Sequence, residues 1–247
     1  MNLNVADGLA LYAAVAKGAR SHPSLSFLVF PPATALHSLA AARRPDDPKL
    51  GGQNCHSEPK GAFTGEISAE QLREAGADYL LVGHSERRRL FCESDTQCRQ
   101  KLLAAWRTGL IPILCVGETL AERERRETRD VLARQIRRAL EGASPRATLL
   151  VAYEPVWAIG TGVVATVEEV AEAHLWVLEE LAAAGRTGAA ETPVLYGGSV
   201  DPKNAVPLAR LPEVGGFLVG GASLQAASYL TIAAALVAEP SSIRGSH

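Results

Sequence analysis

Short apolar runs alternate along this chain with longer segments that have the spacing of amphipathic helices. The runs are rich in β-branched residues, which is typical of strands buried on both faces of a sheet. They occupy residues 27–30, 50–54, 79–82, 111–116, 149–153, 194–196 and 217–219. The clearest helical segments are residues 5–19, 121–140 and 166–184. The last of these begins with a capping box formed by Thr166 and Glu169.

Strict alternation of strands and helices favours a parallel sheet whose crossovers are right-handed. No Pro/Ser-rich linker and no shift in composition divides the chain. We therefore expect one α/β domain over residues 1–243, most simply a (β/α)8 TIM barrel. Residues 244–247, Arg-Gly-Ser-His, resemble the start of a purification tag.

The number of strands is one short of such a barrel. The pattern predicts seven strands and about eight helices, and the chain opens on the helix at residues 5–19, for which Asn4 or Asp7 is a suitable cap. A barrel has to close, because an open parallel edge leaves backbone groups unpaired. The pattern is that of an eight-unit barrel that lacks its first strand.

Composition narrows the class of protein further. The chain has 247 residues, a net charge of −2 and 47% hydrophobic residues, which excludes a disordered chain and offers no basic face for nucleic acid or membrane. No apolar run is long enough to span a membrane, and the first seven residues lack the pattern of a signal peptide. Four cysteines without a CxxC pair argue against zinc and favour the reducing cytoplasm.

Polar and glycine-rich sequences follow four of the predicted strands. In a (β/α)8 barrel these strand ends carry the functional residues. The segments are Gly83-His84-Ser85-Glu86-Arg87, Glu154-Pro155, Gly197-Gly198-Ser199 and Gly220-Gly221.

These segments belong to a longer series of motifs that resembles the triosephosphate isomerase family. The motifs follow in order from about residue 28 to residue 225: Gly51-Gly-Gln-Asn-Cys55, Gly61-Ala-Phe-Thr-Gly-Glu66, Val82-Gly-His-Ser-Glu-Arg87, Cys115-Val-Gly-Glu118, Ala152-Tyr-Glu-Pro-Val-Trp-Ala-Ile-Gly-Thr-Gly162, Tyr196-Gly-Gly-Ser-Val200 and Gly216-Phe-Leu-Val-Gly-Gly-Ala222. The resemblance implies an enzyme that interconverts dihydroxyacetone phosphate and glyceraldehyde 3-phosphate through an enediolate.

That reaction moves a proton between adjacent carbons, so it needs a carboxylate base, a neutral hydrogen-bond donor and exclusion of water. Glu154 resembles the family's base, and His84 resembles its electrophile, a neutral imidazole at a helix N-terminus; the family is itself a standard case of such pKa tuning. Glu86 is a candidate second proton shuttle or an anchor for a neighbouring charge. A lone Glu or His outside such motifs is more often structural, and we assign that role to His22, His37, His56 and His174.

Glycine-rich loops are the candidates for binding the substrate phosphate, because glycine lets backbone N–H groups approach oxygens closely. The expected residues are Gly160, Ser199, Gly220 and Gly221. Residues 155–165 resemble the family's mobile lid, of which the matching positions are Pro155, Trp157, Ile159, Thr161 and Gly162. Val163 stands where the family commonly has a lysine, and hinge residues vary.

Phe63 and Thr64 lie on an otherwise polar loop. Read alone, the loop is a turn with one tucked aromatic ring; the resemblance implies a loop that inserts into a second subunit of a homodimer. Gly160-Thr-Gly162 lacks the rest of a dinucleotide fingerprint and no metal-ligand cluster stands out, so we expect no cofactor and no metal.

The family opens with a strand that ends in an Asn-x-Lys motif, whose lysine helps to bind the phosphate. Met1-Asn2 resembles the continuation of that motif, and none of the five lysines ends a first strand. Three explanations stay open: a misplaced or cut start, a degenerate relative, or another segment in the first-strand position. Two functions follow, an isomerase or a barrel that binds phosphate ligands without turnover.

Overall fold

Seven parallel strands form one curled sheet in the computed structural model, which describes residues 1–237. Every neighbouring pair follows chain order from β1 to β7, so each crossover joins adjacent parallel strands. The strands are β1 (Leu28–Val29), β2 (Lys49–Gly52), β3 (Tyr79–Val82), β4 (Ile111–Val116), β5 (Leu150–Tyr153), β6 (Val194–Tyr196) and β7 (Gly216–Phe217). All seven strands predicted from the apolar runs are confirmed; β3, β4 and β6 keep their predicted ends, and the ends of the others move by at most two residues.

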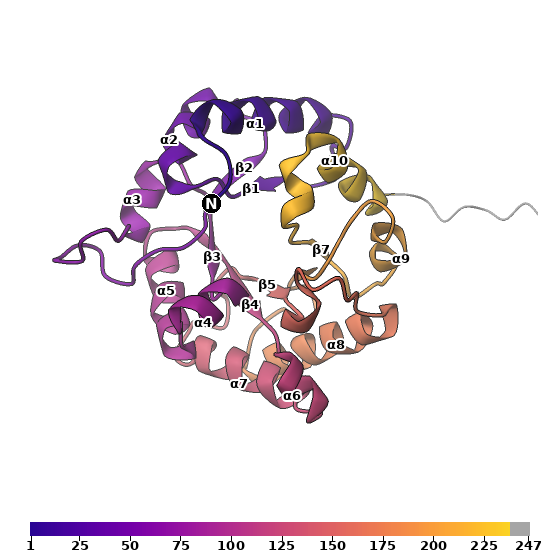
Figure 1. The fold of residues 1–247 in the computed structure, drawn as a ribbon. Coiled ribbons are helices and arrows are strands. Elements are labelled where there is room, and N and C mark those ends of the chain that lie inside the picture. Colours follow the sequence, from indigo (N-terminus) through magenta and orange to yellow (C-terminus); the bar gives the residue numbers. More distant parts are fainter. Residues whose placement is uncertain (238–247) are drawn as a thin grey trace, which may run out of the picture.

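Helices surround the sheet as an outer ring (Figure 1). The α-helices of the described residues are α1 (Val5–Ala19), α2 (Ala33–Ala42), α3 (Ala69–Glu74), α4 (Ser85–Phe91), α5 (Asp95–Arg107), α6 (Leu120–Glu124), α7 (Thr128–Leu140), α8 (Val167–Ala183), α9 (Ala205–Ala209) and α10 (Ala226–Ala235). Two short 3₁₀ turns, η1 (Val156–Ala158) and η2 (Gly221–Leu224), follow β5 and β7. This alternation of strand and helix confirms the predicted TIM-barrel architecture.

Capping side chains set the starts of several helices as the sequence predicts. Asn4, and not Asp7, caps α1, because its side chain accepts a hydrogen bond from the Asp7 amide at 2.9 Å. Thr166 and Glu169 form the expected reciprocal capping box at the start of α8.

The helix predicted over residues 121–140 is wrong as one continuous element. It is two helices, α6 and α7, separated by a turn in which Arg126 has a left-handed φ of 59°. The physical reason lies in the first five residues, none of which is buried, so no apolar face extends the packing of α7 toward the N-terminus. A second capping box, formed by Thr119 and Glu122, starts α6 instead.

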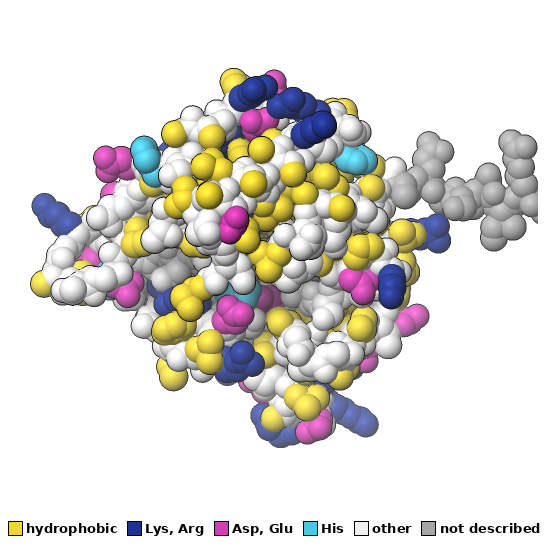
Figure 2. Space-filling model, turned by 45° about the horizontal axis from the view of Figure 1, so that its top comes forward, with side chains coloured by type: hydrophobic (Ala, Val, Ile, Leu, Met, Phe, Trp, Pro, Cys, Tyr) yellow, Lys and Arg dark blue, Asp and Glu magenta, His cyan; other side chains and the backbone are white. Residues whose placement is uncertain are grey.

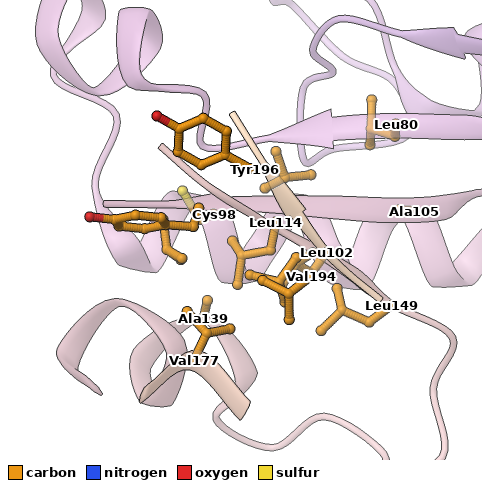
Figure 3. Packing of buried hydrophobic residues seen from close by; sticks show 14 of the residues in the cluster. Leu80, Cys98, Leu102, Ala105, Leu114, Ala139, Leu149, Val177, Val194 and Tyr196 are labelled. Atoms are coloured by element: carbon orange, nitrogen blue, oxygen red, sulfur yellow. The ribbon is translucent and has the colours of Figure 1, made fainter. Parts of the chain in front are cut away.

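Two sets of apolar side chains fill the fold, one between the sheet and the helices and one inside the barrel. Side chains alternate between them along β4: Leu114 and Val116 face the helices, whereas Ile113 and Cys115 face the interior. Figure 3 shows the first set, in which side chains of the strands pack against those of α5, α7 and α8. The interior set is small: Leu81, Ile113, Cys115, Ala152 and Leu195.

The sheet is open between its first and last strands. Within residues 1–237 β1 pairs only with β2 and β7 only with β6, and no strand precedes α1. Leu28, Phe30 and Leu218 border the interior set and are only partly buried. Figure 2 shows hydrophobic side chains spread over the half of the molecule that carries α1 and α10.

No helix within residues 1–237 is long and apolar enough to cross a membrane. The domain boundary predicted at residue 243 and the tag-like residues 244–247 lie outside the described residues.

Candidate active site

His84 and Glu154 meet at the carboxyl ends of β3 and β5. His84 follows β3 by two residues, and Glu154 follows β5 directly. The Nε2 atom of His84 lies 3.1 Å from Oε1 of Glu154. The two residues that the sequence proposes for proton transfer are therefore in hydrogen-bond contact. They come from distant parts of the chain: Ser85, the neighbour of His84, is 69 positions before Glu154.

The His84 ring is held by the start of a helix. His84 is the N-cap of α4, and its Nδ1 accepts a hydrogen bond from the Glu86 amide at 3.3 Å. A backbone amide can only donate, so Nδ1 carries no proton and the proton of the neutral ring sits on Nε2. This places an N–H donor on the side of the ring that faces Glu154. The helix that the sequence predicts soon after Ser85 begins at that residue.

Glu154 is almost completely buried, with 2% of its surface exposed. Its carboxylate accepts hydrogen bonds from the Ser85 amide at 2.8 Å and from the Ser85 hydroxyl at 3.2 Å. Burial raises the pKa of the Glu154 carboxyl, while the nearby His84 and the hydrogen bonds from Ser85 oppose that shift. A raised pKa makes the carboxylate a stronger base than a solvated glutamate.

Glycine at position 197 makes room for the Glu154 side chain. A Cβ atom built on Gly197, at the end of β6, would lie 2.9 Å from Cγ of Glu154. The glycine after the apolar run of β6 therefore has a packing role at the site.

A second buried carboxylate, Glu118, lies under the loop that follows Glu154. The Trp157 indole donates a hydrogen bond to Glu118 at 2.7 Å, and the Tyr153 hydroxyl donates to both of its oxygens at 3.2 Å. Burial raises the pKa of Glu118 against these hydrogen bonds. The guanidinium of Arg123 stacks over the Trp157 ring at 4.0 Å. These contacts fix the first part of the loop.

The rest of that loop is exposed. Pro155, Trp157 and Ala158 are buried or nearly so, whereas Gly160, Thr161 and Gly162 are exposed. Ile159 lies between these two parts and is partly buried. The Thr161 hydroxyl donates to the carbonyl of Trp157 at 2.8 Å, which closes the exposed part on itself.

Neighbouring strands carry the loops proposed for the phosphate. Ser199 follows β6, Gly220 and Gly221 follow β7, and Gly160 lies in the loop after β5. Since β5, β6 and β7 are consecutive neighbours in a parallel sheet, these three loops leave the same end of the barrel. Gly220 accepts hydrogen bonds from the amide and hydroxyl of Ser223, which shapes the turn into η2.

Two other predicted positions lie at the surface. The Glu86 carboxylate is largely exposed, and one of its oxygens lies 4.0 Å from Nδ1 of His84. Phe63 is 43% exposed and stacks on the ring of His56 with centroids 4.0 Å apart. Thr64 is exposed beside it, on a segment between β2 and α3 that projects from the ring (Figure 1).

Sequence reasoning did not single out Ser85 and Cys115, which lie beside Glu154, or Glu118, which lies under the loop that follows it. Ser85 and Glu118 stood inside recognised motifs, and each follows a buried strand, the position that signals function in this fold. Their places beside Glu154 and its loop depend on contacts between strands, which periodicity cannot supply. No group of three or more His, Cys, Asp or Glu residues in the described part of the chain is arranged to hold a metal ion.

Comparison with known proteins agrees with this geometry. The family model described as triosephosphate isomerase matches residues 1–236. The triosephosphate isomerase of Afipia carboxidovorans is 46% identical over 224 residues, which are 90% of this chain and 89% of that protein. That of Xanthobacter autotrophicus is 49% identical, covering 85% and 83% of the two chains.

Among solved structures, the crystal structure of triosephosphate isomerase from Bartonella henselae superimposes with a TM-score of 0.88 at 40% identity. The superposition covers 96% of each chain. The seven strands, the paired His84 and Glu154, and these matches over most of the chain lead to one conclusion. The chain belongs to the triosephosphate isomerase family.

Proposed function

We propose that this chain interconverts dihydroxyacetone phosphate and glyceraldehyde 3-phosphate, the reaction of glycolysis and gluconeogenesis after which its family is named. The observation that supports it is the contact of a buried carboxylate with an imidazole, 3.1 Å between Nε2 of His84 and Oε1 of Glu154. A base and a hydrogen-bond donor within reach of one another are what isomerisation of an α-hydroxy ketone requires.

Proton transfer follows from this pair. Glu154 removes a proton from C1 of the ketone, the electrons of the broken C–H bond form the C1–C2 double bond, and negative charge develops on O2. The Nε2–H of His84 donates a hydrogen bond to that oxygen and stabilises the enediolate. A proton then moves from O1 to O2, with the His84 imidazole as the relay. Glu154 returns its proton to C2, where the electrons of the C1–C2 double bond form the new C2–H bond. The electrons of the broken O1–H bond form the C1–O1 carbonyl, which gives the aldehyde. In the structure the Glu154 carboxylate contacts Ser85 and His84. When substrate binds, its carbonyl oxygen replaces the carboxylate as the hydrogen-bond partner of His84.

The loops after β5, β6 and β7 bind and enclose the substrate. Backbone amides at Gly160, Ser199, Gly220 and Gly221 bind the phosphate, and residues 155–165 act as the lid. The contacts among Trp157, Glu118 and Tyr153 anchor the first part of this loop, while its exposed part is free to move. Closure of the exposed part over Ile159 and the anchored Trp157 covers the carboxylate and removes water. Glu86 anchors the N-terminal end of α4.

The family's first strand and its Asn-x-Lys lysine, which are not found within residues 1–237, affect the expected rate of turnover. Lys101, one of the five lysines, is committed to Glu93 at 2.5 Å and to Asn54 at 2.7 Å. The phosphate and enediolate charges therefore have no lysine from a first strand within residues 1–237. A barrel that binds phosphate ligands without appreciable turnover is the alternative, and the family matches favour the isomerase.

A cytoplasmic homodimer is the form that best suits this chain. The projecting loop with Phe63 and Thr64 offers an exposed aromatic ring to a second copy, in an isologous arrangement. Cys55, Cys98 and Cys115 are buried free thiols, as is usual in a reducing compartment.

The decisive test is isomerisation of glyceraldehyde 3-phosphate by this chain and by Glu154→Asp, with the product followed in a coupled assay. Asp withdraws the carboxylate by one methylene, a misplacement that costs ~10²-fold in turnover. Glu141→Asp, at an exposed carboxylate that precedes β5 in the chain and therefore lies near the opposite end of that strand, serves as the control and should retain turnover. A loss of less than about threefold in Glu154→Asp rejects the assigned base.

His84→Gln separates the donor from the proton relay. Gln keeps an N–H donor and loses the imidazole, so turnover should fall roughly 10²-fold. Unchanged turnover in a folded variant would leave His84 with a structural role only.

A further inference from the structure

Arg88 lies between the strand ends that carry the two proton-transfer groups. Its guanidinium donates three hydrogen bonds in different directions: from Nε to the carbonyl of Gly83 at 2.8 Å, from Nη2 to the carbonyl of Cys115 at 3.2 Å, and from Nη1 to the Asp95 carboxylate at 2.6 Å. Only 17% of the side chain is exposed. One planar group thus connects the end of β3 with β4 and with the start of α5.

One of the two carbonyls that Arg88 binds belongs to Gly83, the residue immediately before His84. Gly83 has a φ of 75°, in the left-handed region, and a Cβ there would meet Sγ of Cys98 at 2.8 Å. The amide of the same residue donates to the buried Glu93 carboxylate at 3.1 Å. Both polar groups of Gly83 are therefore bound by charged side chains, so the backbone leading into His84 has little freedom.

Arg88 also reaches the second proton-transfer group through β4. Cys115, whose carbonyl it binds, lies inside the barrel, and its thiol is close enough to the Glu154 carboxylate to lower the pKa of that group. The two carbonyls that accept from Arg88 thus belong to the residue before His84 and to a residue in contact with Glu154. A shift of either strand end would change the separation of the His84 and Glu154 side chains.

We propose that Arg88 is a positioning residue for the isomerase reaction, which holds the His84 ring at a fixed place relative to Glu154 by binding the carbonyls of Gly83 and Cys115. This inference rests on the proposed function of His84 and Glu154. The role requires arginine, because a planar fork satisfies three acceptors at fixed angles, whereas the ammonium of lysine is a single point at the end of a flexible chain. Asp95 keeps the fork in its plane by accepting from Nη1.

The test compares Arg88→Lys with Arg43→Lys in the 247-residue chain. Arg43 is a matched control, since its guanidinium donates to Asp78, the residue before β3, at 2.5 Å and so acts at the opposite end of the same strand. The first measurement is the ¹⁵N NMR spectrum of the imidazole rings, with the His84 signals assigned by their loss in His84→Gln. In Arg88→Lys the His84 signals should move while those of the buried His174 stay; in Arg43→Lys neither should move.

Turnover is the second measurement. Loss of the fork should lower kcat by about a hundredfold, as expected for a misplacement of order 1 Å, and leave KM within about twofold. KM stays because the loops proposed for the phosphate follow β5, β6 and β7, whereas the hydrogen bonds of Arg88 go to Gly83, Asp95 and Cys115. The NMR result does not depend on turnover, so an inactive parent chain contradicts the proposed function and leaves the positioning of His84 measurable.

Asp95→Asn is the milder variant, for use if Arg88→Lys does not fold. The amide oxygen still accepts from Arg88 while the opposite charge is lost, so the same His84 signals should move by less. The positioning role is overturned if the His84 signals of the folded variants match those of the parent, or if kcat changes no more in Arg88→Lys than in Arg43→Lys.

Discussion

The barrel has a closed side and an open side, and they differ in how their strands are paired. β3 pairs with β4, and β4 with β5, over four residues each, whereas β1 with β2 and β6 with β7 pair over only two. Interior side chains follow the same division. Ile113 and Ala152, on β4 and β5, are completely buried, while Phe30 and Leu218 beside the gap remain partly exposed.

This difference separates the two halves of the site. His84 and Glu154 follow β3 and β5 on the closed side, where extended pairing fixes their separation. Gly220 and Gly221 follow β7, whose outer edge is unpaired in the described residues. The pair proposed for proton transfer thus lies on the closed side of the barrel, and the loops proposed for the phosphate include one at its open edge. A substitution or an extension can therefore change the strand edge beside β7 while the pairing of β3, β4 and β5 stays the same, or the reverse.

The largest effect should come from closing the open side. An apolar strand ending in Asn-Trp-Lys, added before Met1, would pair with β1 and β7 and cover the interior side chains at the gap. Since each large core residue is worth ~2–5 kcal/mol, the melting temperature should rise markedly. The added lysine would stabilise the phosphate and enediolate charges, so turnover should rise by several orders of magnitude.

A matched extension ending in Asn-Trp-Met separates these two gains. It supplies the same strand without the charge, so it should raise the melting temperature and leave turnover close to that of the parent. If the 247-residue chain already turns over at a rate that the Asn-Trp-Lys extension does not improve, another segment supplies both strand and charge.

Replacing a core leucine by alanine should cost more unfolding free energy on the closed side than beside the gap. Leu114 is fully buried on the closed side, and Leu218 is partly buried beside the gap. Leu114→Ala should cost ~2–5 kcal/mol of unfolding free energy, because it leaves a cavity in a packed region. Leu218→Ala removes the same atoms where part of the side chain already meets water, and should cost less than half as much. Chemical denaturation of both variants measures the ranking, and equal losses would contradict it.

Sequence reasoning did well where a residue follows a long apolar run. β3, β4 and β6 agree with their predicted ranges, and His84 and Glu154 were proposed because they stand in family motifs at the ends of β3 and β5. The short strands β1 and β7 were placed less accurately, since only two residues of each pair and glycine interrupts the pattern. The contacts of Arg88 could not be predicted, because they bind backbone carbonyls of two strands and periodicity carries no such information.

Acid should weaken the closed side through His174. This residue lies on α8, completely buried, between the rings of Tyr153 and Tyr196. Burial lowers the pKa of His174 from 6.5 to about 4, so between these values the unfolded chain binds a proton that the folded chain does not. Stability therefore falls as pH drops from 6.5 to about 4, by up to roughly 3 kcal/mol.

The difference in unfolding free energy between the parent and His174→Gln isolates this contribution. Glu154 acts with the opposite sign, because its raised pKa favours the folded state as pH falls, and it cancels in the comparison. The parent should lose more stability than His174→Gln over that pH range. Parallel curves for the two proteins would show that His174 is protonated without unfolding.

The smallest effect concerns the loops at the edge of the open side. If the edge is ordered enough to bind an anion, inorganic phosphate should stabilise the chain by mass action, by about 1.4 kcal/mol at ten times its dissociation constant. That corresponds to a rise of a few degrees in melting temperature for a chain of this size. Chloride at equal ionic strength is the control for general screening. Gly220→Asp places a carboxylate beside the bound anion and should abolish the rise, since a Cβ there meets no other atom within 4 Å and the fold is spared. No rise at millimolar phosphate would mean that the loop after β7 is organised only when the open side is closed.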